Sequence, residues 1–166
     1  MKKEYQSDPG LALLRNPVHF LAFGGGAGLA PRAPGTFGTL VGLVPAWLML
    51  DWALPWRIAA VVAIALLGVW ICGTSARLLG RHDHPGIVFD EIAGILATAL
   101  IIASGSLVEL ALAFVLFRIF DIAKPWPIRD VDHRLHGGTG IMLDDLMAAV
   151  YAAAGLRVIQ IFLPTT

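Results

Sequence analysis

Apolar residues in this chain come in long runs, separated by short segments rich in charge, glycine or proline. Residues 33–50, 58–76 and 92–108 carry no charged side chain. Each of these runs approaches the roughly 20 apolar residues that a membrane-spanning helix needs. The pattern therefore predicts at least three helices within a membrane, although the first run also begins with loop-forming residues.

Two further apolar runs are interrupted by charge. The run that begins at Leu107 contains only Glu109 and Arg118 before it ends, and charged side chains so close to the ends of a helix can reach the membrane surface. The last run, residues 146–163, contains Arg157, and it either spans the membrane or lies against the other helices. The fold class we predict is all-α, a polytopic membrane helix bundle with four to five membrane-embedded helices.

The remaining segments suit a single membrane domain that covers residues 1–166. Residues 1–19 are mostly polar with a few leucines, which predicts a short N-terminal amphipathic segment on the membrane surface. Residues 20–163 would form the membrane-embedded bundle, with a Gly- and Pro-rich loop at its start and polar cytoplasmic loops between its helices. We expect no removable signal peptide, because no apolar run with a cleavage site directly follows the N-terminus.

Composition agrees with a membrane location and excludes some functions. Hydrophobic residues make up 57% of the chain and charged residues only 14%, and the mean hydropathy is +0.75, all far from an average soluble domain. The formal net charge of +0 provides no basic field for nucleic acid. The single cysteine, Cys72, cannot form an internal disulfide.

Positive charges predict the orientation of the bundle. With four crossings, one side collects most of the basic residues, namely Lys2, Lys3, Arg15, Arg32, Arg77, Arg81, Arg118, Lys124, Arg129 and Arg134. The positive-inside rule places that side in the cytoplasm. The same side also receives the acidic residues Asp83, Asp90, Glu91, Asp121, Asp144 and Asp145, whereas Asp51 and Glu109 go to the other side. We therefore expect one site at the cytoplasmic edge.

Two pairs of adjacent carboxylates stand at the starts of apolar runs. Asp90 and Glu91 precede the third run, and Asp144 and Asp145 precede the last. Acidic residues near a helix N-terminus interact favourably with the helix dipole, so capping is one explanation. Capping explains adjacent pairs less well than single residues, and charge at the edge of a membrane is usually functional. We favour metal binding or catalysis, with one member of each pair facing a shared interior.

Two other groups of residues suggest phosphate binding. Asp121 and Lys124 are either an (i, i+3) ion pair or a metal ligand beside a phosphate-binding ammonium, and the sequence does not separate the two. Arg32, with Gly35 and Thr36 at the start of a helix, could hold a phosphate through the guanidinium and backbone N–H groups.

The Gly-rich segments of the chain have simpler explanations. The glycines at residues 24–28 are not a Walker loop, because no Gly-Lys-Ser/Thr follows them, and a flexible loop is the usual meaning of such a run. Gly137, Gly138 and Gly140 predict a close backbone turn that delivers Asp144 and Asp145 to the site.

Four blocks of this sequence, APRAPGTFGTL, IVFDEIAG, FRIFDIAKPWPI and GIMLDDLMAAVYA, resemble in their order the phosphatidylglycerophosphatase A family, over residues 24–151. The resemblance implies a bacterial inner-membrane, multi-pass, Mg²⁺-dependent phosphatase whose active site faces the cytoplasm. It implies that the substrate is a membrane phospholipid, phosphatidylglycerophosphate, and that the products are phosphatidylglycerol and inorganic phosphate. The motif positions of the family fall on Asp90, Glu91, Asp121, Lys124, Asp144 and Asp145.

The mechanism that follows is a hypothesis with open alternatives. The five carboxylates would bind one or two Mg²⁺ ions, since Mg²⁺ prefers oxygen ligands, and Lys124 and Arg32 would stabilise charge on the phosphoryl oxygens. Either a water molecule attacks phosphorus or one aspartate acts as a nucleophile. The main alternative function is a small cation transporter or channel that uses the same carboxylates. An oligomer is possible.

Overall fold

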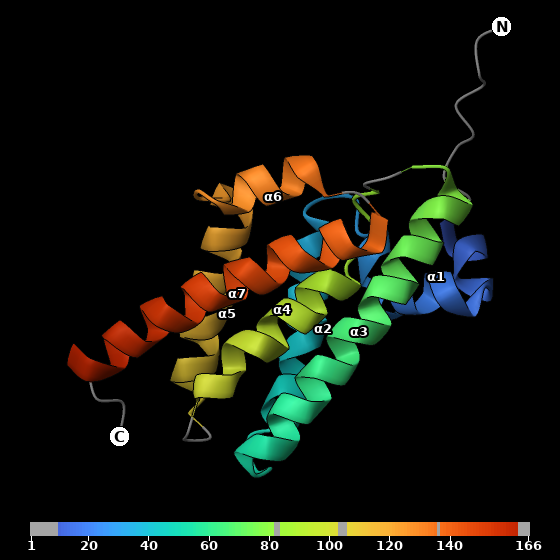
Figure 1. The fold of residues 1–166 in the computed structure, drawn as a ribbon. Coiled ribbons are helices and arrows are strands. Elements are labelled where there is room, and N and C mark those ends of the chain that lie inside the picture. The colour runs from blue at the N-terminus through green and yellow to red at the C-terminus, as the bar shows by residue number, and fades with distance from the viewer. Residues whose placement is uncertain (1–9, 82–83, 103–105, 136, 163–166) are drawn as a thin grey trace, which may run out of the picture.

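The computed structural model describes residues 10–81, 84–102, 106–135 and 137–162, and within these ranges it contains helices and no strands. Three short 3₁₀ helices accompany seven α-helices in the described ranges (Figure 1). In chain order the elements are η1 (Gly10–Arg15), α1 (Pro17–Ala22), η2 (Gly24–Leu29), α2 (Pro34–Leu48), α3 (Leu54–Leu79), α4 (Phe89–Thr98), η3 (Ala99–Ile101), α5 (Leu107–Ala123), α6 (Ile128–Arg134) and α7 (Gly137–Phe162). The predicted all-α fold is confirmed.

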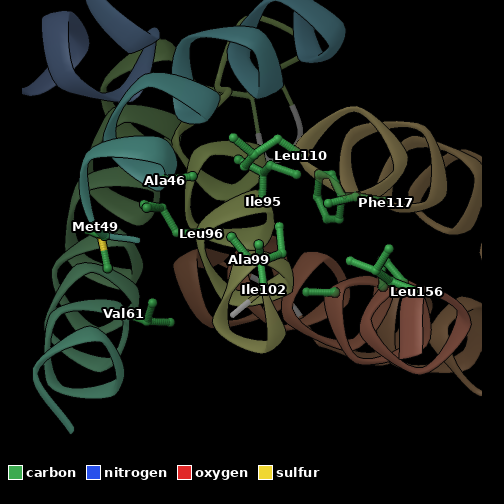
Figure 2. Close-up of a cluster of buried hydrophobic side chains, with 14 of the residues drawn as sticks. Ala46, Met49, Val61, Ile95, Leu96, Ala99, Ile102, Leu110, Phe117 and Leu156 are labelled. Carbon is green, nitrogen blue, oxygen red and sulfur yellow. The ribbon is translucent and has the colours of Figure 1, made fainter. Parts of the chain in front are cut away.

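Helix α4 lies at the centre of the bundle and packs against α2, α3, α5 and α7 (Figure 1). Its buried side chains Ile95 and Leu96 lie in one apolar cluster with Phe117 of α5 and Leu156 of α7 (Figure 2). Because these four helices pack closely around α4, its N-terminal turn is held at a fixed place. That turn carries two of the predicted site residues.

Glycines let α2 lie very close to α4. A Cβ atom added at Gly38 would come within 2.5 Å of Val88 Cβ, and one added at Gly42 within 2.5 Å of Ile95 Cγ2. Both distances are far below van der Waals contact, so larger residues would push the helices apart. The G-x-x-G-x-x-x-G pattern in the first apolar run is therefore a packing surface.

Two helices are long and apolar enough to cross a membrane. They are α3 and α7, with 26 residues each, or about 39 Å at 1.5 Å per residue. Helices α2 and α5 have 15 and 17 residues. The structure thus gives a helical protein with two candidate spans among the described residues, fewer than the four to five helices that the sequence predicts.

The third apolar run does not form one continuous helix. Helix α4 ends at Thr98 and η3 at Ile101, and Ile102 has an extended backbone. Arg57 at the start of α3 explains this end, because its buried guanidinium donates hydrogen bonds to the carbonyls of Ala99 and Ile102. An arginine from another helix therefore satisfies carbonyls that a continued helix would have used.

The Gly-rich segment before Asp144 was predicted as a turn, and this is wrong. Gly137–Phe162 is one helix, so Asp144 and Asp145 lie two turns inside α7 rather than at its start. A Cβ atom at Gly138 would overlap the carbonyl of Val69 in α3. Gly138 serves close packing of α7 on α3, and capping of the α7 N-terminus cannot explain the two carboxylates.

The connector between α5 and α7 contains a helix, whereas the sequence predicted polar loops between the membrane helices. Residues Ile128–Arg134 form α6, which packs against α7, and the Ile128 side chain is fully buried. At the N-terminus, Leu13 is buried while Leu11 is exposed. Residues 1–9, Asp83 and residue 163 of the predicted segments lie outside the described residues.

Candidate active site

Two elements deliver the predicted carboxylates to one place. Asp90 and Glu91 lie in the first turn of α4, and Asp144 and Asp145 lie on the part of α7 that packs against it. Close approach depends on Gly94, where an added Cβ atom would come within 2.4 to 2.5 Å of the Phe117 ring and within 3.4 Å of the Asp145 carbonyl oxygen. The two acidic pairs, far apart in sequence, therefore share one end of the bundle.

Three of these carboxylates form a tight cluster. One oxygen each from Asp90, Glu91 and Asp145 lies within 4.8 Å of the other two. Like charges at this separation in a buried place repel strongly, so the cluster needs bound protons or a cation. The sequence predicted all three residues as ligands, and the structure brings them together.

The cluster has buried oxygen atoms that are not satisfied by protein. Asp90 Oδ1, Glu91 Oε2 and Asp145 Oδ2 are buried and have no hydrogen-bond partner among the residues that the structure describes. Buried polar atoms are nearly always paired, and an unpaired carboxylate oxygen is costly. Three such atoms in one cluster fit a divalent cation with oxygen ligands, such as Mg²⁺.

Burial and mutual repulsion change the acidity of the two carboxyls on α4. Burial raises the pKa of Asp90 well above its usual range, and the charges of Glu91 and Asp145 raise it further. Burial also raises the pKa of Glu91 to about 7, an effect that Asp121 increases and Arg118 opposes. The raised pKa values of both groups mean that a bound cation has to compete with protons for these two carboxyls.

Arg118 connects a fourth carboxylate to the cluster. Its Nη1 atom lies 2.5 Å from Asp121 Oδ2 and 3.8 Å from Glu91 Oε1. From the sequence, Arg118 was predicted only as a charge near a helix end, and Lys124 was considered as the partner of Asp121. The spacing of three residues between Arg118 and Asp121 was the available signal, because residues at i and i+3 share one face of a helix.

Lys124 pairs with Asp144, the first of the two adjacent aspartates of α7. Its Nζ atom donates to Asp144 Oδ2 at 2.6 Å. Lys124 has a left-handed backbone with φ of 41° and ends α5, so its side chain leaves the helix axis there. The site thus contains two cationic side chains, Arg118 and Lys124, each paired with a carboxylate of the site. A phosphate dianion would find both of them near the acidic residues.

The start of α2 forms another wall of the site. A Cβ atom at Gly35 would overlap Glu91 Oε1, so the backbone of α2 lies directly against the cluster. The Thr36 N–H donates to the Ala33 carbonyl at 2.9 Å and is already used within the turn. Arg32 is exposed on the loop before α2. Of the three predicted phosphate-binding residues here, the structure brings Gly35 to the carboxylates.

Fold and site together define a class, an all-helical protein with a buried carboxylate cluster flanked by two cations. Residues 20–160 match the sequence model of one family, described as phosphatidylglycerophosphatase A. The chain belongs to this family, as the four sequence blocks indicated, and the protein is a phosphatase.

Curated relatives agree with this assignment. A phosphatidylglycerophosphatase A of Escherichia coli is 42% identical over 142 residues, which cover 84% of this chain and 81% of the relative. One of Haemophilus influenzae is 42% identical over 149 residues, covering 89% and 91%. A Bacteroides thetaiotaomicron protein with a provisional phosphatidylinositol-3-phosphatase name is 35% identical over 137 residues, covering 78% and 84%. No solved structure matches the chain significantly.

Proposed function

We propose that this protein hydrolyses the phosphomonoester of phosphatidylglycerophosphate to phosphatidylglycerol and inorganic phosphate, with Mg²⁺ as its cofactor. The observation that carries the proposal is the cluster of Asp90, Glu91 and Asp145, with three buried oxygens lacking a partner in the described chain. The names of the two most similar relatives reported above supply the lipid. The name of the third relative implies the same kind of substrate, a phospholipid with a phosphomonoester on its polyol head group.

We also propose that the whole bundle lies in the bacterial inner membrane, with the carboxylate cluster at the cytoplasmic edge. Helices α2, α3 and α5 expose large apolar side chains outward, including Val44, Leu66 and Val115. Such a surface suits lipid rather than water. A site at the membrane edge lets acyl chains stay in the leaflet while the head group reaches the carboxylates. The excess of basic residues on this side supports the orientation.

In this proposal the side chains divide into two groups. Asp90, Glu91 and Asp145 would hold the cation, which when bound would neutralise the phosphomonoester and favour attack by water. Arg118 and Lys124 would stabilise the negative charge on the phosphoryl oxygens. The water oxygen forms a bond to phosphorus, the bond from phosphorus to the head-group oxygen breaks, and that oxygen leaves with a proton as the alcohol.

Asp121 and Asp144 would hold the side chains of Arg118 and Lys124 in place. Each aspartate pairs with one of them in the structure, Asp121 with Arg118 and Asp144 with Lys124. A carboxylate beside the attacking water would accept its proton.

Phosphate release from purified protein tests the function. The wild-type chain in detergent should release phosphate from phosphatidylglycerophosphate, lose this activity in EDTA, and regain it when Mg²⁺ is added back. Asp121→Asn should remove the activity while the variant still unfolds at a temperature near that of the wild type. Release that continues unchanged in EDTA would contradict the metal assignment, and no release under any condition would contradict the function.

A further inference from the structure

A buried hydrogen bond joins the first α-helix of the chain to the long helix α3. His19 in α1 and Ser75 in α3 are both buried, and His19 Nδ1 lies 2.8 Å from Ser75 Oγ. The two residues are 56 positions apart in the sequence, so this bond fixes one segment of the chain on another. The proposed chemistry of the carboxylate cluster uses neither of them.

The other end of α1 holds the residue at which α4 begins. The N–H group of Val88, the N-cap of α4, donates to the carbonyl of Ala22 at 2.8 Å, and Ala22 is the last residue of α1. The N–H groups at the start of a helix lack partners within that helix, so α1 supplies one acceptor there from outside. Asp90 and Glu91 follow directly in the first turn of α4.

Val88 is enclosed so tightly that it cannot move independently of its neighbours. Its side chain is fully buried. A Cβ atom added at Gly24, just after α1, would come within 3.1 Å of Val88 Cγ2, and one added at Gly38 of α2 within 2.5 Å of Val88 Cβ. A displacement of α1 is therefore passed to the first turn of α4, because no free space absorbs it.

Helix α1 is too short to keep its position by itself. Its six residues, Pro17–Ala22, span about 9 Å at 1.5 Å per residue. Isolated helices shorter than about 12 to 15 residues are marginal in water, so the place of α1 depends on its contacts. The Asn16 side chain caps the helix by accepting from the Val18 N–H, whereas the bond from His19 ties the helix to α3.

We propose that His19 is a positioning residue for the metal site. Its bond to Ser75 fixes α1 on α3, and the end of α1 fixes the turn of α4 that presents two carboxylates to Asp145. Asp145 belongs to α7, which packs directly on α3. A shift of α1 would thus change the distance between the carboxylates of α4 and Asp145. Ligand side chains have to stay within about 0.5 Å of their places, so such a shift weakens cation binding. This inference rests on the proposed function, because it takes the cluster to bind a divalent cation.

Three variants change the bond itself. Ser75→Ala removes a single oxygen atom. His19→Phe keeps an aromatic ring of similar shape but lacks the polar atom. His19→Asn is the conservative replacement, because its amide group can take the place of Nδ1 and restore the bond to Ser75.

Two controls separate positioning from a general loss of stability. Thr74→Val removes the neighbouring hydroxyl, whose oxygen accepts from Arg77 within α3. Arg57→Met removes buried hydrogen bonds to carbonyls at the far end of α4, so it lowers stability away from the carboxylate cluster.

Mn²⁺ binding to EDTA-treated protein, measured by electron paramagnetic resonance, tests the proposal. The dissociation constant should rise about five- to tenfold in Ser75→Ala and His19→Phe, as expected for the loss of one buried hydrogen bond. It should return to within about twofold of the wild type in His19→Asn, and Thr74→Val and Arg57→Met should bind as the wild type does. The Mg²⁺ concentration for half-maximal phosphate release should rise in parallel, while the rate at saturating Mg²⁺ changes less than about twofold.

Two results of the binding measurement would overturn the inference. One is an unchanged Mn²⁺ affinity in Ser75→Ala, which decides the matter by itself if His19→Phe does not fold. The other is an equal loss of affinity in Arg57→Met, because affinity would then follow the stability of the whole bundle.

Exchange of the Val88 amide proton in EDTA tests the route from α1 to α4. This proton should exchange slowly in the wild type, about fivefold or more faster in Ser75→Ala, and at the wild-type rate in Thr74→Val. The Ala113 amide in the middle of α5 reports global unfolding and should exchange alike in all three. Equal exchange of the Val88 amide in wild type and Ser75→Ala would also overturn the inference. If the wild type binds no divalent cation, the proposed function fails, and this measurement still decides whether His19 positions the first turn of α4.

Discussion

Both ends of this bundle bury charged side chains, but the hydrogen bonding of these side chains differs between the two ends. At the end where α3 begins, Arg57 donates to two backbone carbonyls, and Glu109 accepts a hydrogen bond from Gln160 at 3.1 Å. At the other end of α4, Asp90, Glu91 and Asp145 crowd together with buried oxygens that lack a partner among the described residues. Helix α4 runs between these two ends (Figure 1).

The difference separates buried charges that are paired within the fold from the carboxylates to which our proposal assigns a function. A buried arginine that donates to carbonyls at a helix end lowers the free energy of the fold, because those carbonyls would otherwise make fewer hydrogen bonds. A cluster of carboxylates raises that free energy until a ligand binds, and active sites commonly carry such a cost. Substitutions at the two ends should therefore have opposite effects on stability and activity.

The largest effect is expected for Asp145→Asn. Removal of one charge from the cluster should lower phosphate release by about 10³-fold or more, because both cation binding and charge stabilisation suffer. The melting temperature in detergent should stay the same or rise, since repulsion in the cluster decreases. Glu109→Gln at the other end is the matched control and should keep wild-type turnover. Activity of Asp145→Asn within a few-fold of the wild type would refute the site.

Arg57→Met should give the reverse result. The Ile102 carbonyl would lose its arginine donor and the Ala99 carbonyl would keep only the Ile102 N–H, at a cost of about 2 kcal/mol or more. Thermal unfolding should occur several degrees lower, while turnover per folded molecule at low temperature stays near the wild type. A variant with normal stability and lost turnover would show that Arg57 acts in the reaction rather than in the stability of the fold.

Gly35→Ala tests how tightly α2 encloses the cluster. The added methyl group would overlap Glu91 Oε1, so the carboxylate has to move and activity should fall about tenfold. The control is Gly155→Ala on α7, where the nearest atom to an added Cβ, Leu116 Cδ2, is 3.6 Å away. That variant should be close to the wild type. Equal activity in the two variants would show that α2 does not constrain the site.

The smallest effect concerns pH. The pKa of Glu91 is about 7 in the folded protein and 4.5 ordinarily, so folded protein binds the proton more tightly. This contribution to stability is complete below pH 4.5 and is lost as pH rises through about 7. In EDTA, Glu91→Gln should melt a few degrees above the wild type at pH 8, with the difference vanishing near pH 4.5. A constant difference across this range would contradict the raised pKa.

Much of the fold was visible in the sequence because apolar runs and helices coincide. Residues 33–50 and 58–76 correspond closely to α2 and α3. The end of α4 was not predictable, since it depends on Arg57 from another helix. The first turns of α7 were missed because glycine usually indicates a turn, and only the packing against Val69 shows why glycine is needed there.

The site was predictable where charge interrupts apolar sequence. Asp90, Glu91 and Asp145 could be named from that signal alone, and the structure shows them within one cluster. The partners of the other carboxylates depend on side-chain direction, so the pairing of Arg118 with Asp121 and of Lys124 with Asp144 needed the three-dimensional structure.

Direct measurement of divalent cation binding tests the central claim, that the three carboxylates of this cluster hold a metal ion. Purified, EDTA-treated wild type, Asp145→Asn and Glu109→Gln would be titrated with Mg²⁺ by calorimetry, and with Mn²⁺ by electron paramagnetic resonance. We predict that Asp145→Asn binds at least about tenfold more weakly than the wild type, and that Glu109→Gln binds as the wild type does. Equal affinity in the wild type and Asp145→Asn would contradict the account.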